Sequence, residues 1–186
     1  SISCYGFPIR EYDNKIPSNL TAEQILIRSG NIGSVRIAQK IGAEKFKTFL
    51  EKVGILSQIT FDIEEVAPQK NYEFSKCKLA TASYGHGIAT TILQLARGYA
   101  ILSNGGFEIN PTLVYKNLEK HAKGARLLNK GVSEQVVSAL RKIVSTEEGT
   151  AKLANVPNYE IGGKTGTADK VLDGVYSEGK VNTFAS

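Results

Sequence analysis

The sequence predicts an α+β domain, because segments with helical periodicity are followed by segments that look like strands. Apolar residues recur at helical spacing in several segments, and an alternating apolar run from Val156 to Ile161 is typical of a strand. The chain has 186 residues, of which 41% are hydrophobic and 22% charged, an ordinary composition for a globular domain. This length is enough for one hydrophobic core, or for most of one.

Residues 1–19 are expected to be irregular, since Pro, Gly and Asn residues interrupt any period there. A first helix is predicted near 21–29. Thr21 can cap its first turn, and Gln24 can reach back to the Thr21 backbone, which is the capping-box pattern.

A second helix is predicted over 31–41, because its apolar residues form a stripe at helical spacing. The stripe consists of Ile32, Val35, Ile37, Ala38 and Ile41. A third helical pattern covers 43–53, and a mixed loop follows over 56–80.

An apolar helix is predicted at 91–103. Thr91 and Gln94 give it a second capping box, and Asn104-Gly105-Gly106 is expected to end it. Its inward face is expected to consist of Ile92, Leu95, Ala96, Tyr99 and Ala100.

Strands are predicted at 107–116 and 156–168, and Ser133 is expected to cap a helix between them. The inward face of that helix is expected to consist of Val136, Val137, Leu140, Ile143 and Val144.

Lys164-Thr165-Gly166-Thr167 is the segment that says most about function. A cation, two hydroxyls and a glycine in consecutive strand positions suit a sheet edge that receives an anionic ligand. Gly166 lets a second backbone approach closely, so an extended peptide can lie there as an added strand. The alternative is a hairpin strand with a solvated lysine.

Ser29-Gly30-Asn31 lies on the short connection between the first two predicted helices, where polar side chains can face a cleft. The alternative is that Ser29 or Asn31 only caps the second helix. If Ser29 acts together with Lys164, their side-chain tips must meet although most of the chain separates them.

These segments together resemble the transpeptidase domain of class B penicillin-binding proteins, most closely the cell-division (septal) type. The similar segments, in family order, are Leu20–Gly33, Ser83–Gly87, Thr91–Gly106, Glu148–Ala151 and Gly163–Ala168. The resemblance implies a serine β-lactamase/transpeptidase-like fold, in which helices flank an antiparallel sheet and an all-helical subdomain closes the cleft.

The family's nucleophilic Ser-x-x-Lys motif is expected to precede Ser-x-Asn, but in this chain the pattern occurs only later, at Ser75–Lys78 and Ser177–Lys180. Ser177 lies in a polar turn pattern, and Ser75 is the better match because an apolar stretch follows it. We therefore expect residues 1–186 to be a partial transpeptidase domain without the nucleophile segment and the C-terminal strands, inactive by itself.

By resemblance, the function is that of a peptidoglycan D,D-transpeptidase of septal synthesis, which cross-links stem peptides through a serine acyl-enzyme and is the target of β-lactams. Ser29 would relay a proton toward the departing amine, and Lys164 would keep that network charged. Asn31 would hold the donor peptide and orient the nucleophilic motif's lysine. The Thr165-Gly166-Thr167 segment would bind the terminal carboxylate through its hydroxyls and provide an oxyanion donor at the Thr167 N–H.

Two other functions remain open. A serine β-lactamase shares the Lys-Thr-Gly chemistry, although no Glu-x-x-Leu-Asn deacylation segment is present. A non-catalytic penicillin-binding sensor or peptidoglycan-binding module is the third. The resemblance implies no cofactor, a location on the extracytoplasmic face of the bacterial membrane, an anchoring helix outside this chain, and divisome or elongation partners.

Composition and spacing argue against other classes. The net charge of +5 comes without a basic stripe or a nucleic-acid motif. No apolar run is long enough to span a membrane. Cys4, Cys77, His86 and His121 lack metal-ligand spacing, so no zinc site is predicted, and a packing or loop role is expected for His86. Whether Cys4 and Cys77 pair stays open.

Overall fold

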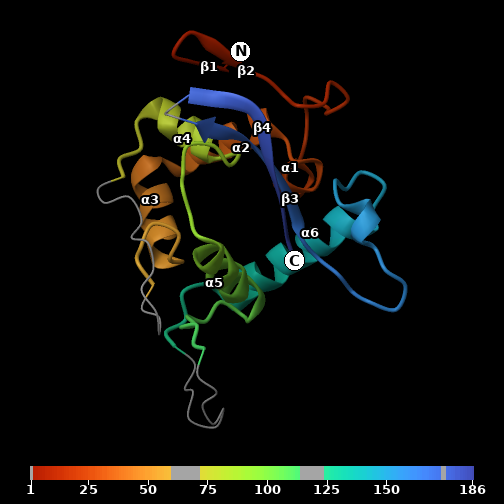
Figure 1. Ribbon diagram of the computed structural model, residues 1–186. Helices are drawn as coiled ribbons and strands as arrows, with labels where there is room; N and C mark the ends of the chain where they lie inside the picture. Colours follow the sequence, from red (N-terminus) through yellow and green to blue (C-terminus); the bar gives the residue numbers. More distant parts are fainter. Residues whose placement is uncertain (1, 60–71, 114–123, 173–174) are drawn as a thin grey trace. The chain divides into compact units, whose positions relative to one another are not determined.

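The computed structural model describes residues 2–59, 72–113, 124–172 and 175–186 (Figure 1). They form two compact units, the first made of residues 1–43, 75–88 and 138–186, and the second of residues 44–74 and 89–137. The helices are α1 (Ala22–Arg28), α2 (Asn31–Ile41), α3 (Ala43–Lys52), α4 (Lys76–Ala82), α5 (Ile92–Ser103) and α6 (Lys130–Ser145), with a short 3-10 helix, η2 (Lys152–Ala154). The strands are β1 (Ile2–Cys4), β2 (Phe7–Ile9), β3 (Lys164–Leu172) and β4 (Val175–Ala185).

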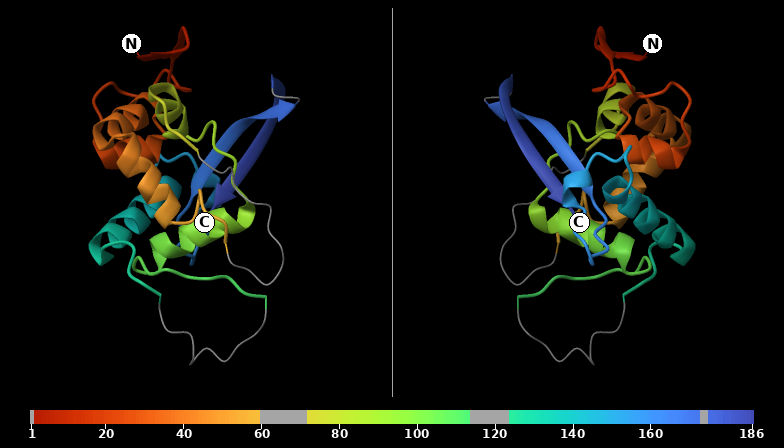
Figure 2. Two further views of the ribbon diagram at one scale, coloured as in Figure 1. Left: turned by 90° about the vertical axis from the view of Figure 1, so that its left-hand side faces the viewer. Right: turned by 90° about the vertical axis from the view of Figure 1, so that its right-hand side faces the viewer.

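The strands of the first unit pair in two antiparallel hairpins, β1–β2 and β3–β4. In the longer hairpin, Lys164 pairs with Ala185, and the register shifts between Asp169 and Val171. Figure 2 shows this blue two-stranded ribbon from two sides. Helices and antiparallel strands together confirm the predicted α+β class.

The prediction that residues 1–19 are irregular is wrong for residues 2–9, which form the β1–β2 hairpin. Tyr5 and Gly6 both have positive φ, 51° and 83°, and this backbone makes the tight turn between β1 and β2. Cys4, at the end of β1, forms a disulfide with Cys77 of α4, with 5.3 Å between the two Cα atoms. The hairpin is therefore attached covalently to α4, and the question of cysteine pairing is answered.

The first two helices occur as predicted, including the capping box at Thr21 and Gln24. The apolar stripe of α2 is narrower than predicted, since only Val35 and Ala38 are buried. The other three members are exposed: Ile32, Ile37 and Ile41. Helix α2 packs against α1 and α4, and Val35 and Ala80 share a small core with Ile2 and Cys4.

In the second unit, α5 has its predicted capping box, and the helix ends at Ser103 with Asn104 as its C-cap. Its buried face is not the predicted one: Gln94, Gly98 and Ile101 are buried, whereas Ile92 is 89% exposed. The polar Gln94 can be buried because its side-chain N–H donates to the Ser57 carbonyl at 2.9 Å.

Helix α6 begins at Lys130, before the expected cap. Ser133 is therefore inside the helix, and its hydroxyl donates to the Leu102 carbonyl at 2.5 Å. Of the predicted face of α6, Leu140, Ile143 and Val144 are buried and Val137 is exposed. The described part of the predicted 107–116 strand makes only an isolated bridge between Phe107 and Arg126, and 114–116 lie outside the described residues. None of the described helices has the length and hydropathy to cross a membrane.

Candidate functional site

Ser29 lies in a strained turn at the end of α1. Its backbone is left-handed, with φ 55° and ψ 42°. The Ser29 N–H bonds to the Leu26 carbonyl at 3.2 Å and the Gly30 N–H to the Ile25 carbonyl at 2.9 Å. These two bonds are those of a Schellman motif, in which glycine is the usual residue at the left-handed position. A serine therefore stands where the backbone favours glycine.

Gly30 is the N-cap of α2 and offers no side chain to its first turn. The alternative, in which Ser29 or Asn31 only caps this helix, is therefore wrong. Asn31 is the first residue of α2, and its side-chain N–H donates to the Arg10 carbonyl at 3.0 Å.

Lys164 and Ser29 meet as predicted. The Lys164 Nζ donates to the Ser29 Oγ at 2.8 Å, although 135 residues separate them in the sequence. A second bond of 2.8 Å runs from the same Nζ to the Thr165 carbonyl. Burial lowers the pKa of Lys164, because the charged ammonium loses water contacts. The ammonium is thus fixed in place and releases a proton more easily than an exposed lysine does.

Helix α6 holds the segment that leads into β3. The Gly163 N–H bonds to the Leu140 carbonyl at 3.1 Å, and Arg141 Nη1 donates to the Ile161 carbonyl at 2.9 Å. At Gly162, a Cβ would lie 3.0 Å from the Arg141 backbone nitrogen, so the glycine permits this close approach. The strand predicted at 156–168 therefore starts only at Lys164, because the preceding backbone bonds to a helix.

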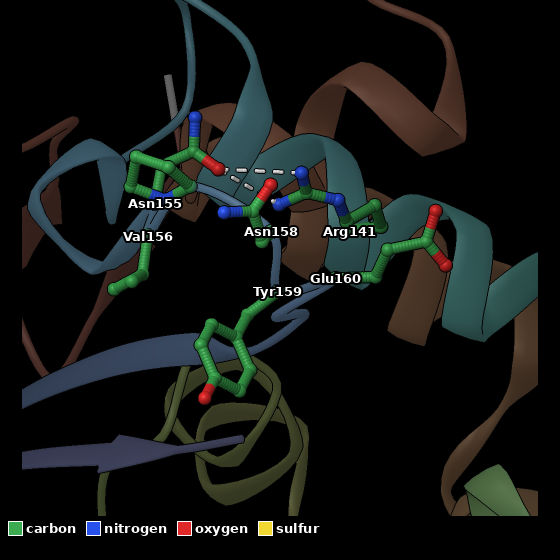
Figure 3. A pocket seen from close by; sticks show the side chains of 7 residues that line it. Arg141, Asn155, Val156, Asn158, Tyr159 and Glu160 are labelled. Carbon is green, nitrogen blue, oxygen red and sulfur yellow. Dashed lines mark hydrogen bonds between the residues drawn. The ribbon is translucent and has the colours of Figure 1, made fainter.

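Arg141, which holds this segment, also borders an open pocket of about 410 Å³. The rest of the pocket lining comes from residues 155–160. Figure 3 shows the Arg141 guanidinium facing the Asn155 side-chain oxygen, to which both terminal nitrogens donate at 3.2 Å. The lining includes neither Ser29 nor Lys164.

The two threonines of β3 already have partners. The Thr165 and Thr150 hydroxyls are 2.9 Å apart, and the Thr167 hydroxyl donates to the Asn182 side-chain oxygen at 3.2 Å. Gly166 pairs with Thr183 of β4, and the other edge of β3 has no strand partner among the described residues. An added strand could pair there. Sequence reasoning gave Thr150 no role, although it lies in a segment of the family resemblance.

Residues 10–15 hold the Ser29 turn from outside, which the sequence did not reveal. The Glu11 carboxylate accepts from the Asn31 N–H at 2.6 Å and from the Ile32 N–H at 3.1 Å. The Tyr12 hydroxyl donates to the Arg28 carbonyl at 3.0 Å. A signal was available only in hindsight: α2 begins at a glycine without a capping side chain.

The two later Ser-x-x-Lys patterns have local structural roles. Ser75 caps α4 by accepting from the Lys78 N–H at 3.3 Å. Ser177 lies in β4 and donates to the Lys170 carbonyl at 3.2 Å, and Lys180 is paired with Asp169. The hydroxyl of each serine is thus engaged with the backbone of its own helix or hairpin.

The last candidates are His86 and the possible metal ligands. The His86 ring packs against Tyr84, with 5.2 Å between centroids, in agreement with a packing role. In the described part of the chain, no three His, Cys, Asp or Glu side chains are grouped to hold a metal ion.

Comparison with known proteins identifies the family. The family model for the penicillin binding protein transpeptidase domain matches residues 4–186. The chain is 30% identical over 179 residues to the peptidoglycan D,D-transpeptidase FtsI homolog of Mesostigma viride, covering 82% of this chain and 30% of that protein. It is 30% identical over 184 residues to the probable peptidoglycan D,D-transpeptidase PenA of Neisseria gonorrhoeae, covering 95% of this chain and 30% of that protein.

Structural similarity agrees with the family match. The apo transpeptidase domain of Burkholderia pseudomallei penicillin-binding protein 3 superimposes with a TM-score of 0.75 at 28% identity, covering 86% of this chain and 49% of that chain. The transpeptidase-like fold predicted from the sequence is thereby confirmed. The chain spans about 30% of the length of the curated relatives it matches. It belongs to the penicillin-binding protein transpeptidase domain family.

Proposed function

We propose that this chain carries the Ser-x-Asn and Lys-Thr-Gly parts of a peptidoglycan D,D-transpeptidase that cross-links stem peptides through a serine acyl-enzyme. The observation that carries the proposal is the 2.8 Å hydrogen bond from Lys164 Nζ to Ser29 Oγ in a chain of this family. Septal cell-wall synthesis is the process we propose, because the relatives include an FtsI homolog.

The Ser29–Lys164 pair can move a proton to the leaving group. Because the ammonium donates to Ser29 Oγ, the hydroxyl's own proton is free to point at the departing amine nitrogen. As that nitrogen takes the Ser29 proton, a proton from Lys164 replaces it, and the lowered pKa of Lys164 favours this second transfer. Ser29 is then restored as a neutral hydroxyl, and the positive charge leaves with the proton.

The free edge of β3 suits the substrate peptide. An extended chain can hydrogen-bond to the backbone groups of this edge, which no other strand pairs among the described residues, and Lys164 supplies positive charge for a terminal carboxylate. The Thr167 hydroxyl now donates to Asn182, so it must rotate to donate to that carboxylate. Thr165 shares its hydroxyl contact with Thr150, and only one of the two can donate in that pair.

We place the acylated serine outside these 186 residues, together with further strands of the sheet, because Ser75 and Ser177 serve local structure. The full-length protein would act on stem peptides and react with β-lactams at the extracytoplasmic face of the membrane, anchored there and associated with division proteins.

The test is acylation of the full-length protein by a fluorescent penicillin. Wild-type protein should form a stable adduct, and Lys164→Ala should lower the acylation rate constant by about 100-fold or more, the usual range for a lost acid–base group. Lys130→Ala, at an exposed lysine that pairs with Glu134, is the matched control and should react at the wild-type rate. An unchanged rate in Lys164→Ala would refute the proposal.

Two outcomes would identify the other functions. Release of hydrolysed penicillin within seconds would indicate a serine β-lactamase, since a transpeptidase keeps the acyl group. A folded full-length protein without any adduct would indicate a binding or sensor module.

A further inference from the structure

The Ser29 turn needs support that its own residues do not supply. Ser29 is held in a left-handed conformation that costs free energy for any residue except glycine. The helix that follows begins at Gly30, which has no side chain to accept from the first N–H groups of α2. Strained residues of this kind persist only where their surroundings fix them.

Glu11 supplies the missing acceptors from 20 residues away. Its two carboxylate oxygens each take one backbone N–H: Oε2 accepts from Asn31 at 2.6 Å, and Oε1 accepts from Ile32 at 3.1 Å. A negative charge at this place also interacts favourably with the positive end of the 11-residue helix α2. A single side chain thus acts as the cap that Gly30 cannot provide.

The neighbours of Glu11 hold the other parts of the turn. The Arg10 carbonyl accepts from the Asn31 side chain at 3.0 Å, and the Tyr12 hydroxyl donates to the Arg28 carbonyl at 3.0 Å. Residues 10–12 therefore contact the residue before Ser29 and the residues after Gly30. Residues 10–12 follow directly after the β1–β2 hairpin, which the disulfide attaches to α4.

We infer that Glu11 is a positioning residue for acyl transfer: its carboxylate keeps the Ser29–Asn31 turn in the conformation that brings Ser29 Oγ to Lys164. The inference rests on the proposed function. Glu11 touches no reacting atom, and it acts by raising the fraction of molecules in which the turn is correctly formed. The acylation rate scales with that fraction, whereas the reaction itself is unchanged.

The experiment separates this role from a general loss of structure. In the full-length protein, stopped-flow labelling with a fluorescent penicillin gives the binding constant Ks and the acylation rate constant k2 separately. Glu11→Ala should lower k2 by about 2- to 30-fold, the range that corresponds to a lost helix cap. Ks should change little, and the final labelling per protein should stay at the wild-type value, because the fold remains intact.

Two further variants sharpen the test. Glu147→Gln removes a carboxylate whose side chain is 96% exposed, and should leave k2 unchanged. In Glu11→Ala, adding Gly30→Ser should restore part of k2, because a serine at the N-cap can accept from the first turn of α2. The backbone of Gly30, at φ −70°, suits serine, and a Cβ there would have no atom nearer than 3.8 Å.

The outcomes are distinguishable. An unchanged k2 in Glu11→Ala, a loss explained entirely by fewer labelled molecules, or no recovery with Gly30→Ser would overturn the positioning role. Failure of the proposed function would appear elsewhere, as a wild-type protein without an adduct or as an unaffected Lys164→Ala. Hydrogen exchange gives a readout independent of activity: the Asn31 and Ile32 amides should exchange faster in Glu11→Ala and not in Glu147→Gln, and equal protection would also refute the inference.

Discussion

Replacing Ser29 by glycine should stabilise the protein relative to alanine while both changes disable the site. Both variants lose the hydroxyl that accepts from Lys164, so that contact cancels when they are compared. They differ in the backbone. At φ 55°, a residue with a Cβ costs about 1–2 kcal/mol relative to the right-handed conformation. Glycine avoids this cost but loses about 0.4–1 kcal/mol through its larger freedom in the unfolded chain.

The net expectation is that Ser29→Gly is more stable than Ser29→Ala by about 1 kcal/mol, which corresponds to a Tm about 2–4 °C higher in a protein of 150–250 residues. Urea unfolding of the two variants in the same protein measures the difference directly. Ser138, exposed in the middle of α6, is the matched control. There glycine should be less stable than alanine by about 1 kcal/mol, because the backbone is helical.

The sign of the difference decides the outcome. Opposite signs at the two serines would show that the Ser29 turn stores backbone strain. A Ser29→Gly variant no more stable than Ser29→Ala would refute the strain and, with it, the reason for the external support from Glu11. Acylation should be strongly reduced in both variants, so greater stability in the glycine variant would accompany loss of function.

Four other predictions concern the strand and the missing nucleophile. The acylation rate should fall as pH rises through the lowered pKa of Lys164, because the proton relay through Ser29 needs the charged ammonium. Lys164→Arg should react more slowly than wild type and should not show this fall at alkaline pH. A wild-type rate that stays flat up to the ordinary pKa of lysine would contradict this prediction. The free energy of unfolding should rise with pH between the lowered pKa of Lys164 and the ordinary pKa of lysine, since the unfolded chain binds the Lys164 proton more tightly than the folded chain. The profile of Lys164→Met is subtracted as the control. A flat or falling difference would be evidence against the burial of that charge. Gly163→Ala should destabilise the protein by about 1–3 kcal/mol in a thermal or urea melt, because its Cβ would lie 2.6 Å from the Ala185 carbonyl oxygen. Gly131→Ala is the control and should not destabilise, because its Cβ would lie 3.5 Å from the Asn129 side-chain oxygen. The 186-residue chain alone should form no covalent adduct with a labelled penicillin, and mass-mapped labelling at Ser75 or Ser177 would disprove the structural roles assigned to those serines.

Local features of the fold could be predicted from the sequence because they depend on neighbouring residues. Both capping boxes, at Thr21 and Thr91, follow from a spacing of three residues and are present. The tight turn at Tyr5-Gly6 was missed, because its strands have three residues each and show no period. The start of β3 was placed too early, since the apolar alternation before Gly162 looks like a strand, whereas the Ile161 carbonyl and the Gly163 N–H bond to α6.

In the candidate site too, some contacts could be predicted from the sequence and others could not. The contact between Ser29 and Lys164 was predicted through the family resemblance, since no spacing rule joins residues 135 positions apart. Glu11 could not be predicted, because no spacing rule joins its carboxylate to the Asn31 N–H, 20 residues away. The left-handed backbone of Ser29 was also hidden, since glycine, the usual signal for it, is absent at that position.

A double-mutant cycle on acylation tests the direct coupling of Ser29 and Lys164. The rate constants of wild-type protein, Ser29→Ala, Lys164→Ala and the double variant give the coupling free energy between the two side chains. A hydrogen bond to a charged group predicts a coupling of about 1.5–3 kcal/mol, so the rate lost in the double variant should be about 10- to 150-fold smaller than the product of the two single losses. Effects that add to within about 0.5 kcal/mol would show that the two residues act independently, and would contradict the proton relay built on their contact.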